Sequence, residues 1–195
     1  MSTEVSTWGR KFTANKAIFS FLGNAFRIYG PEGNLRFFVK QKAFKLKEDI
    51  NVFADEGQSD LRLNIKARSW GDFSGTYDVN DTDGTALGSA KREGFKSMLR
   101  DSWQVMGKGD EVIAKLEEDS MLMAMIRRVF LKGWIPQGFT VRSTGGDVVG
   151  VIKQRFNPFR LTYDVDFEMD KAGVIDSKLA VGLVVLLLAI EGRQN

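Results

Sequence analysis

The sequence predicts a mainly β protein: a closed barrel of twelve antiparallel strands around a buried hydrophobic C-terminal helix, in a single domain over residues 1–195. Three observations predict this fold. A hairpin pattern recurs five times along the chain. The inward positions of these hairpins are apolar or small. Near the end of the chain, residues 179–190 read LAVGLVVLLLAI, without a polar side chain.

Each copy of the repeat begins with an aromatic residue or Ile, has Ile or Val two positions later, and ends at a lysine. The openings are Phe26-x-Ile28, Ile50-x-Val52, Tyr77-x-Val79, Trp103-x-Val105 and Phe139-x-Val141, and the closing lysines are Lys40, Lys66, Lys91, Lys115 and Lys153. Between them every copy carries Gly with Asp, Glu, Lys or Pro, the kind of segment in which Gly and Asp form tight turns. Each copy therefore predicts one hairpin.

Side chains alternate between the two faces of a strand, so the residues before each lysine divide into an inward and an outward set. The predicted inward residues are Leu35, Phe37, Val39, Leu61, Leu63, Ile65, Ala86, Gly88, Ala90, Val112, Ala114, Leu116, Val148, Gly150 and Ile152. In the third copy they are small, which predicts that a helix passes close to that strand. Each closing lysine then points to solvent.

The apolar segment predicts a central helix over residues 176–191. Its twelve apolar residues fall short of the ~20 that span a bilayer, which argues against a transmembrane helix. A helix that is apolar on all sides must then be surrounded by protein. Asp176 is the expected N-cap and Gly192 the expected C-cap.

Two further strands, at residues 17–22 and 161–167, complete the twelve, and residues 1–15 are expected to form an N-terminal extension. The closing lysines are 26, 25 and 24 residues apart, and then 38. The longer step contains residues 119–132, DSMLMAMIRRVFLK, with apolar residues at helical spacing and cations in the last turn. This predicts a surface helix inserted between the fourth and fifth hairpins.

Composition excludes several classes of function. The chain has neither cysteine nor histidine, which excludes disulfides, the usual zinc sites and His-based or Cys-based catalysis. Its formal net charge is +3, which is compatible with an anionic partner without requiring one. The N-terminus lacks the apolar core of a secretory signal. We expect a cytoplasmic monomer that needs no cofactor and binds no nucleic acid.

Three segments resemble the tubby C-terminal-like superfamily, which includes tubby proteins, phospholipid scramblases and LURP-one-related proteins. They are FRIYGPEGNLRFFVKQKAFKLKEDINVFADEG, YDVNDTDGTALGSAKREGF and YDVDFEMDKAGVIDSKLAVGLVVLLLAI. The resemblance extends from about Lys16 to Gly192 and is nearest to LURP-one-related and bacterial members. It implies a twelve-stranded barrel around a hydrophobic C-terminal helix, the fold that the repeat predicts independently.

The resemblance also implies a membrane ligand, because tubby proteins bind phosphoinositide headgroups through a Lys-x-Arg pair on a strand. Lys66-x-Arg68 and Lys153-x-Arg155 match this pattern. Residues two apart on a strand share a face, so such a pair could hold one phosphate, with Arg binding it bidentately. The alternative is that these cations are ordinary solvated surface.

The predicted helix at residues 119–132 is a second candidate for a lipid contact. It combines Arg127, Arg128 and Lys132 with three methionines, in the manner of a helix that lies at a membrane interface. The alternative is that its apolar stripe packs on the barrel.

A third candidate is a series of acidic residues before the final helix: Asp164, Asp166, Glu168 and Asp170. Alternation predicts one outward strand face, and carboxylate oxygens are ligands that calcium prefers. Scramblases are similar here, with an acidic calcium-linked segment, but the Phe, Gly and Pro of that segment are missing from this chain.

Two functions follow from these patterns. The first is a non-enzymatic domain that binds anionic phospholipid and is peripheral at the inner membrane face. The second is a scaffold or regulatory protein that binds another protein and has no lipid role. An enzyme is not expected, because the carboxylate clusters lie where turns and helix starts favour acids, and a helix inside the barrel leaves no deep pocket.

Overall fold

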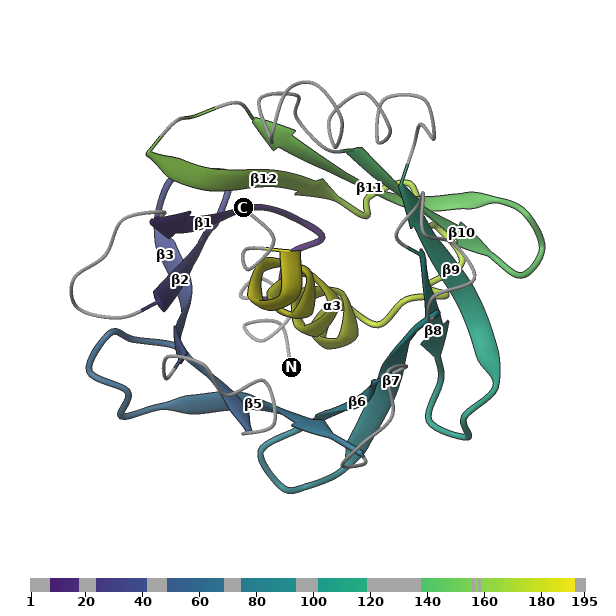
Figure 1. Ribbon diagram of the computed structural model, residues 1–195, viewed down its shortest axis with the longest axis horizontal. Helices are drawn as coiled ribbons and strands as arrows, with labels where there is room; N and C mark the ends of the chain where they lie inside the picture. Colours follow the sequence, from purple (N-terminus) through teal and green to yellow (C-terminus); the bar gives the residue numbers. More distant parts are fainter. Residues whose placement is uncertain are drawn as a thin grey trace.

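The structure is a computed structural model that describes residues 8–17, 24–41, 49–68, 75–93, 102–118, 138–155, 157 and 159–191. The chain forms a closed barrel of twelve antiparallel strands followed by a C-terminal helix (Figure 1). The strands are β1 (Lys11–Ala17), β2 (Asn24–Tyr29), β3 (Leu35–Gln41), β4 (Ile50–Phe53), β5 (Leu61–Ala67), β6 (Thr76–Asn80), β7 (Ala86–Arg92), β8 (Ser102–Met106), β9 (Val112–Glu118), β10 (Gly138–Ser143), β11 (Val148–Arg155) and β12 (Arg160–Asp166), and the helix is α3 (Ser177–Glu191).

Each strand pairs with its neighbours in sequence, and β1 also pairs with β12, which closes the ring. The predicted closed barrel of successive hairpins is confirmed. Consecutive antiparallel strands alternate in direction, so the five hairpin turns predicted from the repeat all lie at one end of the barrel, which we call the turn end. The connection from β11 to β12 lies at the other end, which we call the connection end.

The first strand differs from its prediction, since it runs from Lys11 to Ala17 rather than over residues 17–22. Residues 11–15, expected in an N-terminal extension, therefore belong to the barrel; residues 18–23 lie outside the described part. The inward positions of β1 are Phe12, Ala14 and Lys16. A pattern of apolar inward residues does not predict a buried lysine. The Lys16 ammonium is nevertheless placed for a cation–π interaction, because it lies 5.2 Å from the centre of the Phe26 ring.

The predicted inward sets are correct except at their first residue. In the first hairpin the register shifts between Ile28 and Tyr29, because one extra residue of β3 forms a β-bulge. The same shift occurs in the other four hairpins, after Val52, Val79, Val105 and Val141. Strict alternation fails at each bulge. The residues that it wrongly places in the core are Leu35, Leu61, Ala86, Val112 and Val148.

The hairpin turns place a residue of positive φ just before the bulged strand. Three turns use Gly33, Gly84 and Gly146. The other two use Gln58 and Asp110, with φ of 59° and 62°, although a glycine directly precedes each of them. Asp tolerates this backbone conformation better than most residues.

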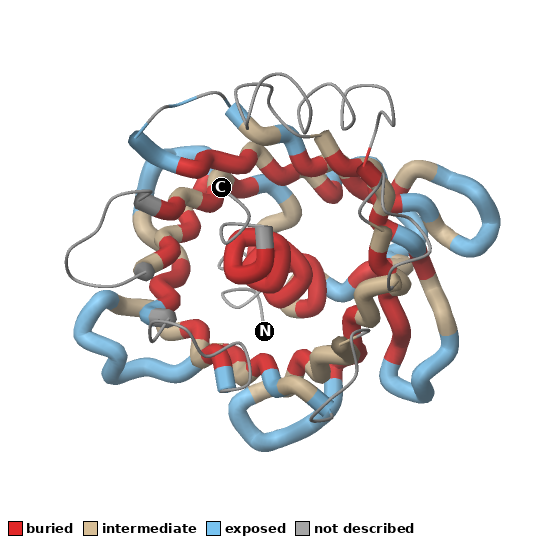
Figure 2. Tube along the Cα trace, viewed as in Figure 1, coloured by how far each residue is buried: buried red, intermediate tan, exposed pale blue. Residues whose placement is uncertain are grey.

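Residues 179–190 of α3 are all buried, and the helix runs through the ring of strands (Figure 2). Asp176 caps it as predicted, accepting hydrogen bonds from the amides of Lys178 at 2.8 Å and Leu179 at 3.4 Å. The Lys178 ammonium pairs with Asp81 in the β6–β7 turn, so the helix begins at the turn end. Gly192 and residues 119–132 lie outside the described residues. No helix in the described ranges is long and apolar enough to cross a membrane.

Candidate functional site

The two Lys-x-Arg pairs lie on opposite sides of the barrel. Lys66 is on β5 and Arg68 follows that strand, whereas Lys153 and Arg155 are on β11. Six of the twelve strand-to-strand steps separate β5 from β11 around the closed ring (Figure 1). All four side chains are exposed, as predicted. The structure does not bring the two pairs together, so one flat surface can contact only one of them.

Arg68 is held by two carboxylates. Its guanidinium donates to Asp78 on β6, with Nε 3.0 Å from Oδ1, and to both oxygens of Asp110, at 3.0 and 2.8 Å. The hydrogen bonds to Asp78 and then to Asp110 raise the pKa of Arg68. Together Lys66, Arg68 and these two acids have a formal charge of zero. Arg68 therefore ties the β8–β9 turn to β6, and a phosphate would have to displace a carboxylate to reach it.

The β11 pair retains a net positive charge. Arg155 binds one carboxylate, Asp164, through Nε and Nη2, each at 2.8 Å. Asp164 also accepts a hydrogen bond from the Thr13 hydroxyl at 3.0 Å. The Lys153 side chain is exposed, and within the described ranges it makes no ion pair. Two cations against one carboxylate leave a formal +1 on this face.

Lys153 also borders a hollow of about 410 Å³ on the outer surface of β1, β12 and β11. Its wall includes a second ion pair, between Lys11 Nζ and Asp166 Oδ2 at 3.2 Å. The lining residues are Lys11, Phe12, Thr13, Pro31, Val151, Lys153, Asp164, Val165 and Asp166. The hollow thus offers cations and carboxylates side by side, and Lys153 is the cation there without an ion pair among the described residues.

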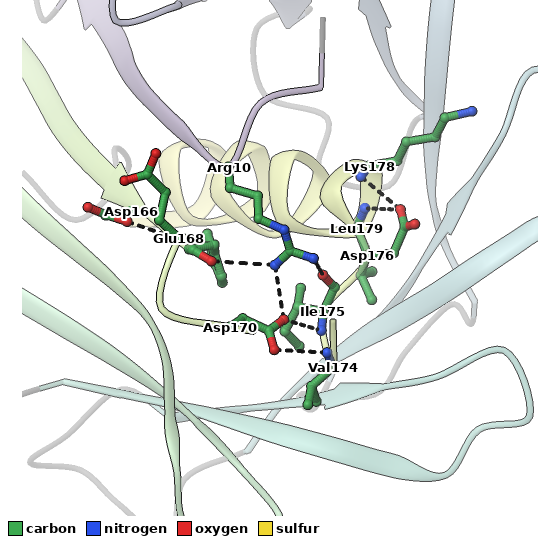
Figure 3. Close-up of polar contacts among 10 residues, drawn as sticks. Arg10, Asp166, Glu168, Asp170, Val174, Ile175, Asp176, Lys178 and Leu179 are labelled. Atoms are coloured by element: carbon green, nitrogen blue, oxygen red, sulfur yellow. Dashed lines mark hydrogen bonds and ion pairs between the residues drawn. The ribbon is translucent and has the colours of Figure 1, made fainter. Parts of the chain in front are cut away.

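The acidic series does not form one outward face. β12 ends at Asp166, and the chain then turns, with the amide of Asp170 donating to the Phe167 carbonyl. The prediction of an outward Asp170 was wrong: its side chain is inaccessible and accepts hydrogen bonds from Arg10 at 3.0 Å and from the amides of Val174 and Ile175, each at 2.9 Å (Figure 3).

Asp164 and Asp166 do face outward, but each is already bonded. Asp164 binds Arg155, while Asp166 pairs with Lys11 and accepts from the amide of Glu168 at 2.8 Å. Among the residues that the structure describes, no three His, Cys, Asp or Glu side chains are grouped so as to hold a metal ion. The candidates Arg127, Arg128 and Lys132 lie outside those residues.

An exposed aromatic residue that the sequence patterns did not indicate follows the β11 pair in the chain. Phe159, in the connection from β11 to β12, is 71% exposed. The Asn157 side chain accepts hydrogen bonds from the amides of Phe159 at 2.9 Å and Arg160 at 3.0 Å. The signal was present as RFNPFR at residues 155–160, two aromatics between two arginines.

Comparison with known proteins gives one family. No curated protein sequence matches this chain. A family model for LURP-one-related proteins matches residues 35–188, which contain β3 to β12 and most of α3. The match covers most of the chain, and the observed barrel with its C-terminal helix agrees with the tubby-like fold. The chain therefore belongs to the LURP-one-related family, within the tubby-like superfamily.

Proposed function

We propose that this protein is a non-enzymatic domain that binds anionic phospholipid at the inner face of a membrane through the outer surface of β11. The observation that carries the proposal is the formal +1 on Lys153, Arg155 and Asp164. The other Lys-x-Arg pair, Lys66 and Arg68, is neutralised by its two carboxylates.

The chemistry of the β11 face fits a phosphate group. Lys153 is exposed, and its ammonium can reach an anion without breaking an ion pair in the described structure. Arg155 already binds a carboxylate in the bidentate geometry that it would use for a phosphate, so a headgroup can exchange with Asp164. Near an anionic leaflet each such cation contributes about 1 kcal/mol, and the attraction falls off within a Debye length.

The predicted surface helix at residues 119–132 belongs to the same proposal. β9 and β11 run in the same direction, because each is antiparallel to β10. The segment after β9 therefore leaves the barrel at the connection end, like the segment after β11. We propose that Arg127, Arg128 and Lys132 add to the same contact.

Flotation of the purified protein with liposomes tests the proposal. Phosphatidylcholine vesicles are compared with vesicles that also contain phosphatidylserine or a phosphoinositide, at low and at physiological salt. We expect binding only to the anionic vesicles, and less at the higher salt. The double variant Lys153→Ala/Arg155→Ala should lose most of this binding, because it leaves Asp164 without its cations.

The matched control is Lys66→Ala/Arg68→Ala, which removes the same formal charge from the opposite side of the barrel. Because Arg68 also holds the β8–β9 turn, Lys66→Ala alone is a second control, and thermal melting checks the fold of each variant. Equal losses in the two double variants would contradict a site on β11. Absence of binding to every vesicle would exclude the lipid role and favour the protein-binding scaffold.

A further inference from the structure

We propose that the barrel approaches an anionic bilayer with its connection end, and that Phe159 enters the interfacial region there. This inference rests on the proposed lipid binding and adds to it an orientation and an apolar anchor. The observations behind it are the exposure of Phe159, the cations beside it and the unequal charge of the two barrel ends.

Three large hydrophobic side chains are exposed among the described residues, and Phe159 is by far the most exposed of them. It is 71% exposed, against 37% for Leu61 and 39% for Met169. Single exposed apolar residues are common, so exposure alone decides little. Phe159 is, however, held in a defined position, because the Asn157 carboxamide oxygen accepts from its amide and from that of Arg160. The backbone of Phe159 is thus fixed by a hydrogen bond, and its side chain is exposed.

The β11–β12 hairpin that carries Phe159 also carries three cations. Arg160 follows Phe159 directly and is exposed, and no ion pair of its side chain occurs within the described ranges. Arg155 and Lys153 are on the strand that enters the same connection. Three cations against the two carboxylates of this hairpin, Asp164 and Asp166, give it a formal +1, and Asp166 is already paired with Lys11 of β1. Aromatic rings beside Lys and Arg are typical of segments that lie at a membrane interface, since the ring enters the headgroup region and the cations bind phosphates.

The hairpin turns at the turn end carry an excess of acidic residues over their one cation, Lys108. The acids are Glu32, Asp55, Glu56, Asp60, Asp81, Asp83, Asp110, Glu111 and Asp147. Five of them pair with Arg or Lys side chains outside the turns, and the other four make no ion pair within the described ranges: Asp55, Asp83, Glu111 and Asp147. At the connection end, Arg155 is the last residue of β11 and Arg160 the first residue of β12. An anionic surface therefore repels the turn end and attracts the connection end.

A single cysteine tests the orientation, because the chain has none of its own. Phe159→Cys, labelled with an environment-sensitive fluorophore, is mixed with phosphatidylserine-containing vesicles. Leu61→Cys is the matched control. Leu61 is the first residue of β5, directly after the β4–β5 hairpin turn, and therefore lies at the turn end. We expect a blue shift and quenching by lipid-attached quenchers at position 159, with no change at position 61.

Flotation supplies the second readout. Phe159→Ser should weaken binding to these vesicles about tenfold, because transfer of a Phe side chain out of water stabilises binding by about that factor or more. Phe159→Leu should bind nearly as well as the wild type. Neither substitution should change the melting temperature of the protein, because the side chain at position 159 is exposed.

Failure of this inference is distinct from failure of the proposed function. If the unaltered protein floats with anionic vesicles, but the label at position 159 stays in water and Phe159→Ser binds normally, the orientation and anchor are wrong and the lipid site remains. A shift at position 61 instead would reverse the orientation. If the unaltered protein binds no vesicle, both proposals are wrong.

Discussion

Asp170 shows how one side chain joins three parts of the chain. Its carboxylate binds Arg10, just before β1, and the amides of Val174 and Ile175, just before α3 (Figure 3). Arg10 in turn donates to the carbonyl of Ile175 at 3.1 Å. The start of the barrel is thereby tied to the start of the helix. In a sequence such a residue looks like one more surface acid, because its partner lies 160 positions away.

The pKa of Asp170 makes this contact measurable. Burial by itself would raise this pKa. The hydrogen bonds from Ile175, Val174 and Arg10 lower it by a larger amount, so the pKa lies below the ordinary value of about 3.9. A carboxyl group with a lowered folded-state pKa contributes stability above its unfolded pKa and loses it as the pH falls through the folded value. The free energy of unfolding should therefore decrease as the pH falls below about 4.

We expect Asp170→Asn to reduce the free energy of unfolding at pH 7 by about 3 kcal/mol, since it leaves the Arg10 cation without its buried partner. The difference from the wild type should narrow as the pH falls below about 4. Urea unfolding at pH 7 and at several acidic pH values measures both effects. Asp147→Asn, in an exposed turn, is the control. An Asp170→Asn protein with unchanged stability at pH 7 would show that the contact is dispensable.

At the scale of elements, the repeat contains more than a hairpin signal. The five copies share a β-bulge at the same place, and their turns share a positive-φ residue before the bulged strand. A bulge increases the local twist and bends its strand, and a small barrel requires such bending. The conformation also explains why Leu61, at a position predicted to face inward, is exposed.

The close packing of α3 against β7 depends on Gly88. A Cβ atom at this position would lie 2.5 Å from the Met106 carbonyl oxygen and 2.9 Å from Cδ2 of Leu179, and its φ of 150° disfavours other residues. Backbone atoms cannot move away without disturbing the β7–β8 ladder. The predicted close approach of a helix to the small residues of β7 is thus observed at Gly88.

We expect Gly88→Ala to lower the free energy of unfolding by about 3 kcal/mol, because the new methyl group overlaps backbone and helix. Gly33→Ala is the matched control. Its φ is 79°, but nothing lies within 4 Å of the added Cβ, so only backbone strain of about 1 kcal/mol applies. Chemical denaturation of both variants checks the ranking. Equal losses would mean that close packing against the helix is not what requires glycine at position 88.

At the scale of the whole molecule, barrel and helix share one core. The inward side chains of the strands and residues 179–190 belong to the same hydrophobic cluster. Neither part can bury its apolar surface without the other, since a ring of this size would be hollow without the helix. We therefore expect a single cooperative unfolding transition for the whole domain.

Val185→Asp tests this cooperativity. Val185 is fully buried near the middle of α3, and an unpaired charge there costs several kcal/mol against a net stability of ~5 to 15. We expect loss of near-UV circular dichroism and of a cooperative thermal transition. Val185→Ala is the control; it should still melt cooperatively, with stability lower by about 2 kcal/mol. A Val185→Asp protein that melts like the wild type would contradict the shared core.

The sequence by itself determined the number of hairpins, the closed barrel, the C-terminal helix and its cap at Asp176. These follow from local periods and turn residues that repeat along the chain. It also identified Lys153 and Arg155 as a pair on one strand face. What it could not provide was any contact whose partner is distant in sequence.

Only the tertiary structure decided which charges are already neutralised. Arg68 and Arg155 are alike in sequence, yet Asp110, 42 residues away, reaches Arg68 alone, because the β8–β9 turn folds towards β6. The burial of Lys16 and Asp170, the bulges and the exposure of Phe159 are of the same kind. Each depends on where other strands lie, and strand alternation within one segment contains no information about that.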